Sequence, residues 1–265
     1  MRSRSELTTI LYIFSPLLMF TVIYMAGSAL MEAGWSLLSR YYAAEESGAA
    51  LVYTRTAVWN YISQVFPAAA GCIAVRSSAI AELAAYPRRK PVHARFFPVL
   101  LITCAALSIS INILFSLIMP AAGNSVPEAD SLPGMTGFIL QAAVYGFCMP
   151  LIEEILFRGI LFARLERAYG LFFAAAASSV AFGIWHGALP QGIYALLLGA
   201  VFALAYAVTG RLAVPFALHG TCNLTILLLQ WTGAWSAVCT PVWCAVVSVI
   251  AAGGFFTASQ IYANS

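Results

Sequence analysis

Charged residues are scarce in this sequence. Only 9% of its 265 residues are Asp, Glu, Lys or Arg, whereas 62% are hydrophobic. Soluble globular proteins carry about 25% charged residues, and a water-soluble domain of this size could not hide so much apolar surface. The scarcity of charge therefore excludes an ordinary soluble domain and indicates a protein whose solvent is the lipid bilayer.

Other shortages exclude further classes of protein. The net charge is only +3, and no basic patch interleaved with aromatic residues suggests a nucleic-acid partner. The six cysteines form no CxxC pair and mostly lie inside apolar runs, which is typical of small core residues rather than of disulfides or metal sites. The first apolar run continues to about Met31 without a clean cleavage site, so we interpret it as a retained membrane span.

Long apolar runs are abundant. A membrane-spanning helix needs roughly 20 apolar residues, and polar breaks separate eight such runs in this chain. We therefore predict an all-α fold, a polytopic transmembrane helical bundle of about eight spans. The predicted spans are residues 8–31, 50–75, 97–119, 134–152, 171–188, 192–209, 213–232 and 236–258.

The placement of lysine and arginine predicts the orientation of the bundle. The 76–95 loop, the segment after the fourth span and the loop near 210 are basic, whereas the 120–133 loop contains two acidic residues and no Lys or Arg. The loops at 187–191 and 232–236 carry no charge. Because basic loops stay on the cytoplasmic side, their alternation predicts that both termini are cytoplasmic. The short loops and compact length favour a bacterial plasma membrane.

Two neighbouring acids stand at the predicted end of the fourth span. Charges inside a membrane are costly and usually functional. Glu154 precedes Arg158 by four residues, so the two share a helix face and can form an ion pair; Glu153 then faces elsewhere. A carboxylate that is removed from water without a cation beside it holds protons more readily and can act as a general base. Alternatively, the two glutamates belong to an interfacial charge cluster that ends the span.

Two of the three histidines also lie in apolar spans. His186 follows Phe182 by four residues, so the phenyl ring can pack beside the imidazole as a supporting residue that excludes water. His219 and Asn223, again four residues apart, share a helix face and would point into the bundle together. The alternatives are a structural histidine at a helix end and ordinary interhelical hydrogen bonds.

Combined, these segments predict a site that activates water. Glu153 would take a proton from water with the help of His186, and His219 and Asn223 would donate hydrogen bonds to the developing oxyanion. A second version of the site places a zinc ion on Glu153, His186 and His219, with water at the open position. The spacing is not that of a His-Glu-x-x-His zinc protease, and both versions stay open.

The ordered segments resemble the motifs of the CAAX-processing and bacteriocin-processing (CPBP) family of membrane proteins. The matching motifs are Glu153-Glu154 with Arg158, Phe182 with His186, and His219 with Asn223. The resemblance covers roughly residues 134–235 and implies an all-helical fold with a membrane cavity that opens toward the cytoplasm. It also implies that Glu153 and His186 activate water, that His219 and Asn223 bind the oxyanion, and that Glu154 and Arg158 support them.

The resemblance further implies an intramembrane endopeptidase that cleaves a membrane-embedded or lipidated peptide, as type II CAAX prenyl endopeptidases do. Residues 134–265 would then be the transmembrane catalytic core and residues 1–133 scaffold helices of one integrated membrane domain. Two alternatives are a proton-coupled transporter, because intramembrane acids and histidines also build proton relays, and a non-catalytic immunity protein that binds a bacteriocin. No internal repeat relates the two halves of the chain, which disfavours the transporter.

Overall fold

The computed structural model describes residues 6–43, 48–87, 89, 91–118 and 134–265, without the side chains of residues 42–57, and every element among them is a helix. Seven helices are long and apolar enough to span a membrane, and an eighth, α7, is apolar but has only 15 residues. The predicted polytopic all-α bundle is therefore confirmed. The helices are α1 Glu6–Ala43, α2 Gly48–Ala85, α3 Phe96–Ile118, α4 Gly134–Ala143, η2 Val144–Cys148, α5 Met149–Glu154, η3 Ile155–Phe162, α6 Ala163–Tyr169, α7 Leu171–Trp185, α8 Leu189–Thr209, α9 Ala213–Trp231, α10 Trp235–Val238 and α11 Pro241–Ala263.

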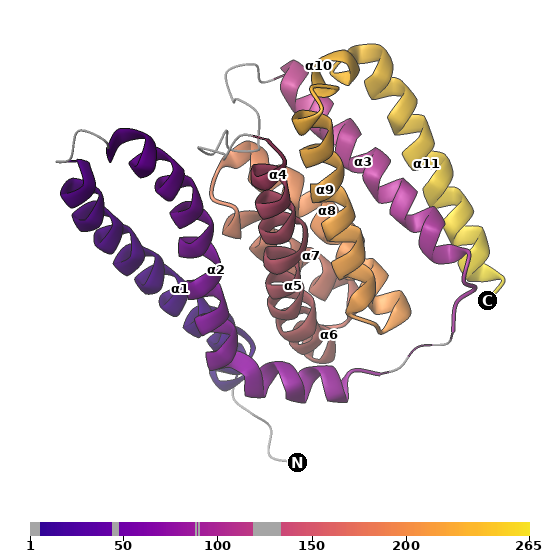
Figure 1. Cartoon of the computed structure of the whole chain (residues 1–265). Helices are drawn as coiled ribbons and strands as arrows, with labels where there is room; N and C mark the ends of the chain where they lie inside the picture. Colours follow the sequence, from indigo (N-terminus) through magenta and orange to yellow (C-terminus); the bar gives the residue numbers. More distant parts are fainter. Residues whose placement is uncertain (1–5, 44–47, 88, 90, 119–133) are drawn as a thin grey trace.

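The helices are arranged in two groups (Figure 1). α1 and α2 form a hairpin on one side, and they contact the rest of the protein mainly through α5 and η3. α3 packs along α9 and α11 on the other side. Between the groups lie α7, α8 and the continuous helical segment that comprises α4, η2, α5, η3 and α6, called here the α4–α6 run. α3 thus joins the C-terminal helices in one bundle. The predicted 120–133 loop lies outside the described residues.

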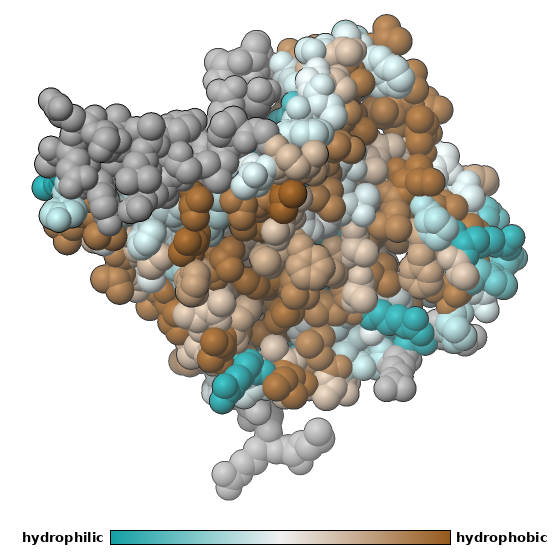
Figure 2. All heavy atoms as spheres, viewed as in Figure 1, coloured by the Kyte–Doolittle hydropathy of each residue, from teal (hydrophilic) through white to brown (hydrophobic). Residues whose placement is uncertain are grey.

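The surface of the bundle is apolar. Figure 2 shows hydrophobic side chains across the middle of the visible face, with hydrophilic ones along its lower rim and its right-hand edge. Large apolar side chains such as Leu30, Phe172 and Ile184 are exposed on this surface. An exposed apolar surface of this kind, on helices long enough to span a bilayer, marks contact with lipid, so the chain is an integral membrane protein.

The basic loops gather at one end of the bundle. The ends of α2 and α6, the start of α3 and the α8–α9 turn all lie at the lower end in Figure 1, together with the start of α1 and the end of α11. Arg89, Arg95, Arg167 and Arg211 therefore share this end, as the alternation of basic loops requires. Which side of the membrane this end faces stays a prediction.

The fourth span is longer than the sequence predicts. The helical run does not stop at 152 but continues to Tyr169 through the π-helical segments η2 and η3. Glu153 and Glu154 consequently lie near the middle of the run, buried inside the protein, and not at an interfacial helix end. The physical reason is that Glu154 pairs with Arg158 within the same helix, so the charges do not force the helix to end.

Candidate active site

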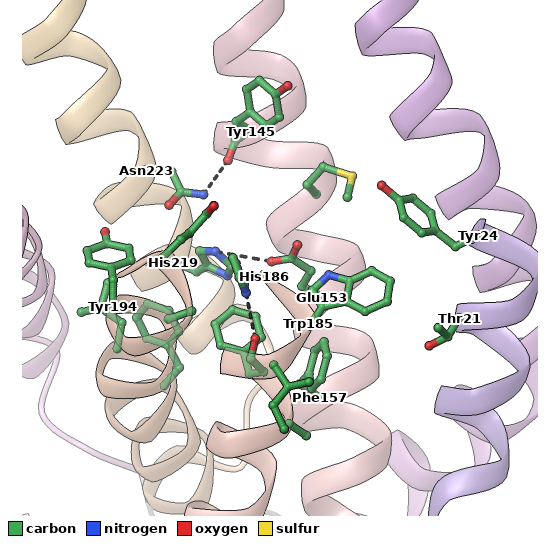
Figure 3. Close-up of a pocket in the computed structure, with 18 of the residues that line it drawn as sticks. Thr21, Tyr24, Tyr145, Glu153, Phe157, Trp185, His186, Tyr194, His219 and Asn223 are labelled. Atoms are coloured by element: carbon green, nitrogen blue, oxygen red, sulfur yellow. Dashed lines mark hydrogen bonds and ion pairs between the residues drawn. The ribbon is translucent and has the colours of Figure 1, made fainter. Parts of the chain in front are cut away.

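A cavity of about 750 Å³ lies between α1, α2, the α4–α6 run, α7, α8 and α9. The four residues that the sequence predicts to act on water and on the oxyanion all line it (Figure 3). They are Glu153, His186, His219 and Asn223. The fold thus brings side chains from three separate predicted spans to one internal space.

The Glu154 carboxylate is held from two sides. Nη1 of Arg158 donates to its Oε1 at 2.9 Å, and Nδ1 of His219 lies 2.9 Å from the same oxygen. Arg158 also donates from Nη2 to the carbonyl of Gly199 at 3.1 Å, and its guanidinium lies over the Phe182 ring at 4.3 Å. The predicted Glu154–Arg158 pair is therefore present, fully buried, and it ties the α4–α6 run to α8 and α9.

His219 connects the two glutamates. An ionised carboxylate only accepts hydrogen bonds, so Nδ1 of His219 carries the hydrogen that Glu154 accepts. Nε2 then faces Oε2 of Glu153 at 3.6 Å, which is too long for a direct hydrogen bond. The imidazole stacks on the Phe202 ring with centroids 5.2 Å apart, which fixes its plane. His219 is thus the histidine whose ring nitrogen approaches Glu153, and the predicted roles of His186 in holding water and of His219 in binding the oxyanion stay predictions.

His186 caps the short helix α7. Its Nδ1 lies 2.8 Å from the carbonyl oxygen of Phe182, and because a carbonyl only accepts, this nitrogen carries the hydrogen. The neutral ring then keeps Nε2 as an acceptor. The Phe182 ring packs edge-on against the imidazole with centroids 4.7 Å apart, as their spacing predicts. Gly187, with φ of 73°, ends the helix directly after the histidine.

The side chain of Asn223 donates a hydrogen bond to a backbone carbonyl that has no donor within its own π-helical turn. Its Nδ2 donates to the carbonyl of Tyr145 at 2.8 Å. In η2 the N–H of Met149 donates to Val144, five residues back, and not to Tyr145. The next residue, Pro150, has no N–H to donate. The Tyr145 carbonyl consequently has no helical donor, and the Asn223 amide replaces it.

A close backbone contact brings α9 against this turn. A Cβ atom on Gly220 would lie 2.6 Å from the carbonyl oxygen of Gly146, so a side chain here would push α9 away from η2. Gly220 follows His219 directly and precedes Asn223 by three residues. The glycine contact therefore sets the depth at which both polar side chains enter the cavity.

Several cavity residues escape prediction from the sequence. Trp185 lies beside Glu153 and packs on Tyr24 of α1, with ring centroids 5.3 Å apart. Tyr145 and Gln64 also line the cavity. A lone aromatic or amide side chain in an apolar helix has no characteristic spacing, and only the position of Trp185 next to His186 could have drawn attention to it.

The zinc version of the site requires three converging ligands. The part of the chain that the structure describes contains no group of three or more His, Cys, Asp or Glu side chains placed to hold a metal ion. Glu153, His186 and His219 share the cavity, and the hydrogen bonds at Nδ1 leave Nε2 of each imidazole available, but the three side chains are not placed close enough together to form such a group. These residues do not fit a metal-ligand set in this arrangement.

Comparisons with known proteins match the part of the chain that contains these four residues. Residues 135–225 match the family model described as type II CAAX prenyl endopeptidase Rce1-like. The chain is 35% identical over 107 residues to the putative membrane peptidase YdiL of Bacillus subtilis, and 31% identical over 99 residues to the membrane-embedded CAAX protease MroQ of Staphylococcus aureus. These alignments cover 40% and 35% of this chain, and 43% and 39% of the two relatives. No solved structure matches the chain.

Proposed function

We propose that this integral membrane protein, whose residues 135–225 match the Rce1-like CAAX prenyl endopeptidase family model, is an intramembrane endopeptidase that cleaves a membrane-embedded or lipidated peptide. The observation that supports this proposal is the convergence of Glu153, His186, His219 and Asn223 on one cavity inside an apolar bundle. Hydrolysis within a membrane needs polar groups that bind a water molecule and stabilise the charge that develops on the substrate oxygen, and these four side chains can do both. The bacterial origin of both relatives favours a bacterial plasma membrane. The basic loops favour a cytoplasmic location for both termini.

In the proposed reaction, Glu153 acts as the general base. A water molecule has two hydrogens, and the site offers two acceptors for them: the Glu153 carboxylate and Nε2 of His186. This arrangement would turn a lone pair of the water oxygen toward the substrate carbonyl carbon. Glu153 takes one proton as the C–O bond forms, and the carbonyl π electrons move to the oxygen.

His219 and Asn223 are the proposed oxyanion partners. The Asn223 amide nitrogen has two hydrogens, of which one is donated to Tyr145 and the second is left for the oxyanion. As an imidazolium, His219 would donate from Nδ1 to Glu154 and from Nε2 to the oxyanion. The tetrahedral intermediate then collapses, the C–N bond breaks, and Glu153 returns its proton to the leaving amine.

Substitution of the general base tests the proposal. Glu153→Gln and His186→Ala should each lower cleavage by about 10²–10⁴-fold, the range of a lost acid–base contribution, while Glu32→Gln, at an exposed acid of α1, should change nothing. The assay uses the purified full-length protein in lipid vesicles with a mixture of farnesylated and unmodified hydrophobic peptides, and mass spectrometry identifies the products. Full activity of Glu153→Gln would reject the mechanism, as would a protective effect against a toxin peptide that survives this substitution.

We further propose that water activation proceeds without a metal, because the described donor atoms do not form a ligand set. Treatment with a strong zinc chelator such as 1,10-phenanthroline should then leave the cleavage rate unchanged, and added zinc should not raise it. A loss of activity that zinc restores would instead require a metal on Glu153, His186 and His219.

A further inference from the structure

Five neutral polar side chains lie together where the N-terminal hairpin meets η2. Three of them, Tyr24, Gln64 and Tyr145, line the cavity, and Ser28 of α1 and Tyr61 of α2 lie beside them. Tyr145 precedes Glu153 by two turns in the α4–α6 run, whose other end reaches the basic end of the bundle (Figures 1 and 3). The group therefore lies on the side of Glu153 that is farther from the basic loops.

The Tyr61 hydroxyl is buried without a partner. Its side chain is only 3% exposed, and the oxygen makes no hydrogen bond with the described part of the chain. Its ring packs edge-on against Tyr145 with centroids 6.0 Å apart, and the two hydroxyls are close enough to interact electrostatically. A buried hydroxyl that bonds to nothing costs free energy, and nearly all such groups in folded proteins bond to protein or to ordered water. Tyr61 thus lacks a protein partner and requires another one.

The same pattern recurs on α1. The Ser28 hydroxyl lies near that of Tyr24, one turn earlier, but the two do not reach the geometry of an ordinary hydrogen bond. The Tyr24 hydroxyl also interacts electrostatically with Glu153 and with Tyr145. Polar groups that approach one another without bonding directly are the usual setting for a bridging water.

The chemistry and the available space suit water. Each hydroxyl can both donate and accept, and Tyr145 keeps its own O–H free to donate because its oxygen accepts from Nε2 of Gln64 at 2.8 Å. A buried water takes about three hydrogen bonds and about 30 Å³, and the adjoining cavity has about 750 Å³. The five side chains carry no charge, so they match a neutral ligand better than an ion.

Building on the function proposed above, we propose that Tyr61, Tyr145, Tyr24, Ser28 and Gln64 hold a small cluster of bound water beside Glu153, which replaces the water consumed in each cleavage. Hydrolysis uses one water molecule per peptide bond, and the surrounding lipid cannot supply it. A substrate in the cavity displaces loosely held water, whereas Tyr61 lies outside the set of residues that line the cavity. These side chains hold water and take no part in proton transfer.

The sign of a stability change tests whether Tyr61 is hydrated. If its hydroxyl is dry, Tyr61→Phe removes an unsatisfied group and should raise the melting temperature of the full-length protein in detergent. If water is bound there, the substitution removes a hydrogen bond and should lower the melting temperature by about 2–4 °C, which is the expected result. Tyr262→Phe, an exposed tyrosine on α11, is the matched control and should change nothing. An unchanged or higher melting temperature of Tyr61→Phe would overturn the proposal.

Radiolytic labelling detects the bound water itself. A short X-ray exposure forms hydroxyl radicals from water held at a site, and mass spectrometry locates the oxygen added to the nearest side chain. Tyr61 should be labelled although it is buried, whereas Phe162, which is fully buried between Tyr86 and Tyr206, should stay unlabelled. Equal absence of label on the two residues would also overturn the proposal.

Kinetics then test whether this water serves the reaction. Tyr61→Phe should lower kcat for peptide cleavage roughly 3- to 10-fold, the value of one hydrogen bond, and leave KM unchanged because the residue does not line the cavity. An unchanged kcat would mean that the bound water does not supply the reaction. If peptides are cleaved but Tyr61 takes no label, the hydrolase proposal stands and the water proposal fails. If Tyr61 is labelled but no peptide is cleaved, the hydrolase proposal fails and only the binding of water is supported.

Discussion

The two ring nitrogens of His219 have different partners. Nδ1 is committed to the buried Glu154, and only Nε2 remains for Glu153 and for a substrate. The Glu154–Arg158 pair therefore acts through His219, since it fixes which nitrogen carries a hydrogen and in which plane the imidazole lies. These two residues are positioning residues for the proposed reaction and touch neither water nor substrate.

Removing one partner of this pair should be far more damaging than removing both. Arg158→Met leaves the buried Glu154 carboxylate without its arginine and with His219 alone beside it, and should lower the free energy of unfolding by about 3–5 kcal/mol. Glu154→Gln combined with Arg158→Met leaves no bare charge and should recover most of that stability. Thermal unfolding in detergent measures both effects.

The double variant also separates stability from catalysis. A neutral amide at position 154 can still accept from His219 but cannot stabilise an imidazolium, so cleavage should stay about 10- to 100-fold below the wild type. Wild-type activity in the stable double variant would show that His219 needs no ionised partner.

At the scale of helices, the site depends on one irregular turn and one close contact. The π-helical turn η2 and Pro150 together release the Tyr145 carbonyl for Asn223, and the Gly220–Gly146 contact lets α9 reach it. π-helical turns of this kind recur at functional sites because they aim groups that a regular helix would not.

A pair of glycine substitutions tests this contact. Gly220→Ala places a methyl group 2.6 Å from a backbone oxygen, so α9 must shift, and both the melting temperature and the cleavage rate should fall. Gly253→Ala, in α11 with no neighbouring atom within 4 Å, should be neutral or stabilise the protein by up to about 1 kcal/mol, since alanine is the better helix former. Equal behaviour of the two variants would mean that α9 does not need the close approach.

Features within one helix could be predicted from the sequence, whereas contacts between helices could not. The long apolar helices were predictable because lipid demands long apolar runs, and the Glu154–Arg158 and Phe182–His186 pairs were predictable because both are local, four residues apart. The helix continues beyond 152 because the buried Glu154–Arg158 pair within it compensates the charge of Glu154. The approach of His219 to Glu153 depends instead on contacts between distant helices. The contribution of α1 to the cavity wall has the same origin, and no periodicity encodes it.

For the molecule as a whole, a buried ionic cluster joins the N-terminal hairpin to the α4–α6 run. Glu82 of α2 accepts hydrogen bonds from Tyr12 of α1 and from Arg164 and Arg167 of α6. Beside it, burial and then a hydrogen bond to Glu166 raise the pKa of Tyr86 far above its usual range, so the phenol stays protonated. The cluster lies at the basic end of the bundle and holds the cavity wall of α1 in place.

Orientation in the membrane follows from that basic end and can be measured. Because arginine-rich loops are retained in the cytoplasm, the end that carries Arg89 and Arg211 should face inward, along with the end of α11. In a chain with all six native cysteines replaced by alanine, a single cysteine in place of His93 or Ser265 should react with a membrane-impermeant maleimide only after the cells are permeabilised. A cysteine in place of Ser236, in α10 at the opposite end, should react in intact cells. The reverse pattern would put both termini outside, and the proposed cytoplasmic location of the basic loops would then be wrong.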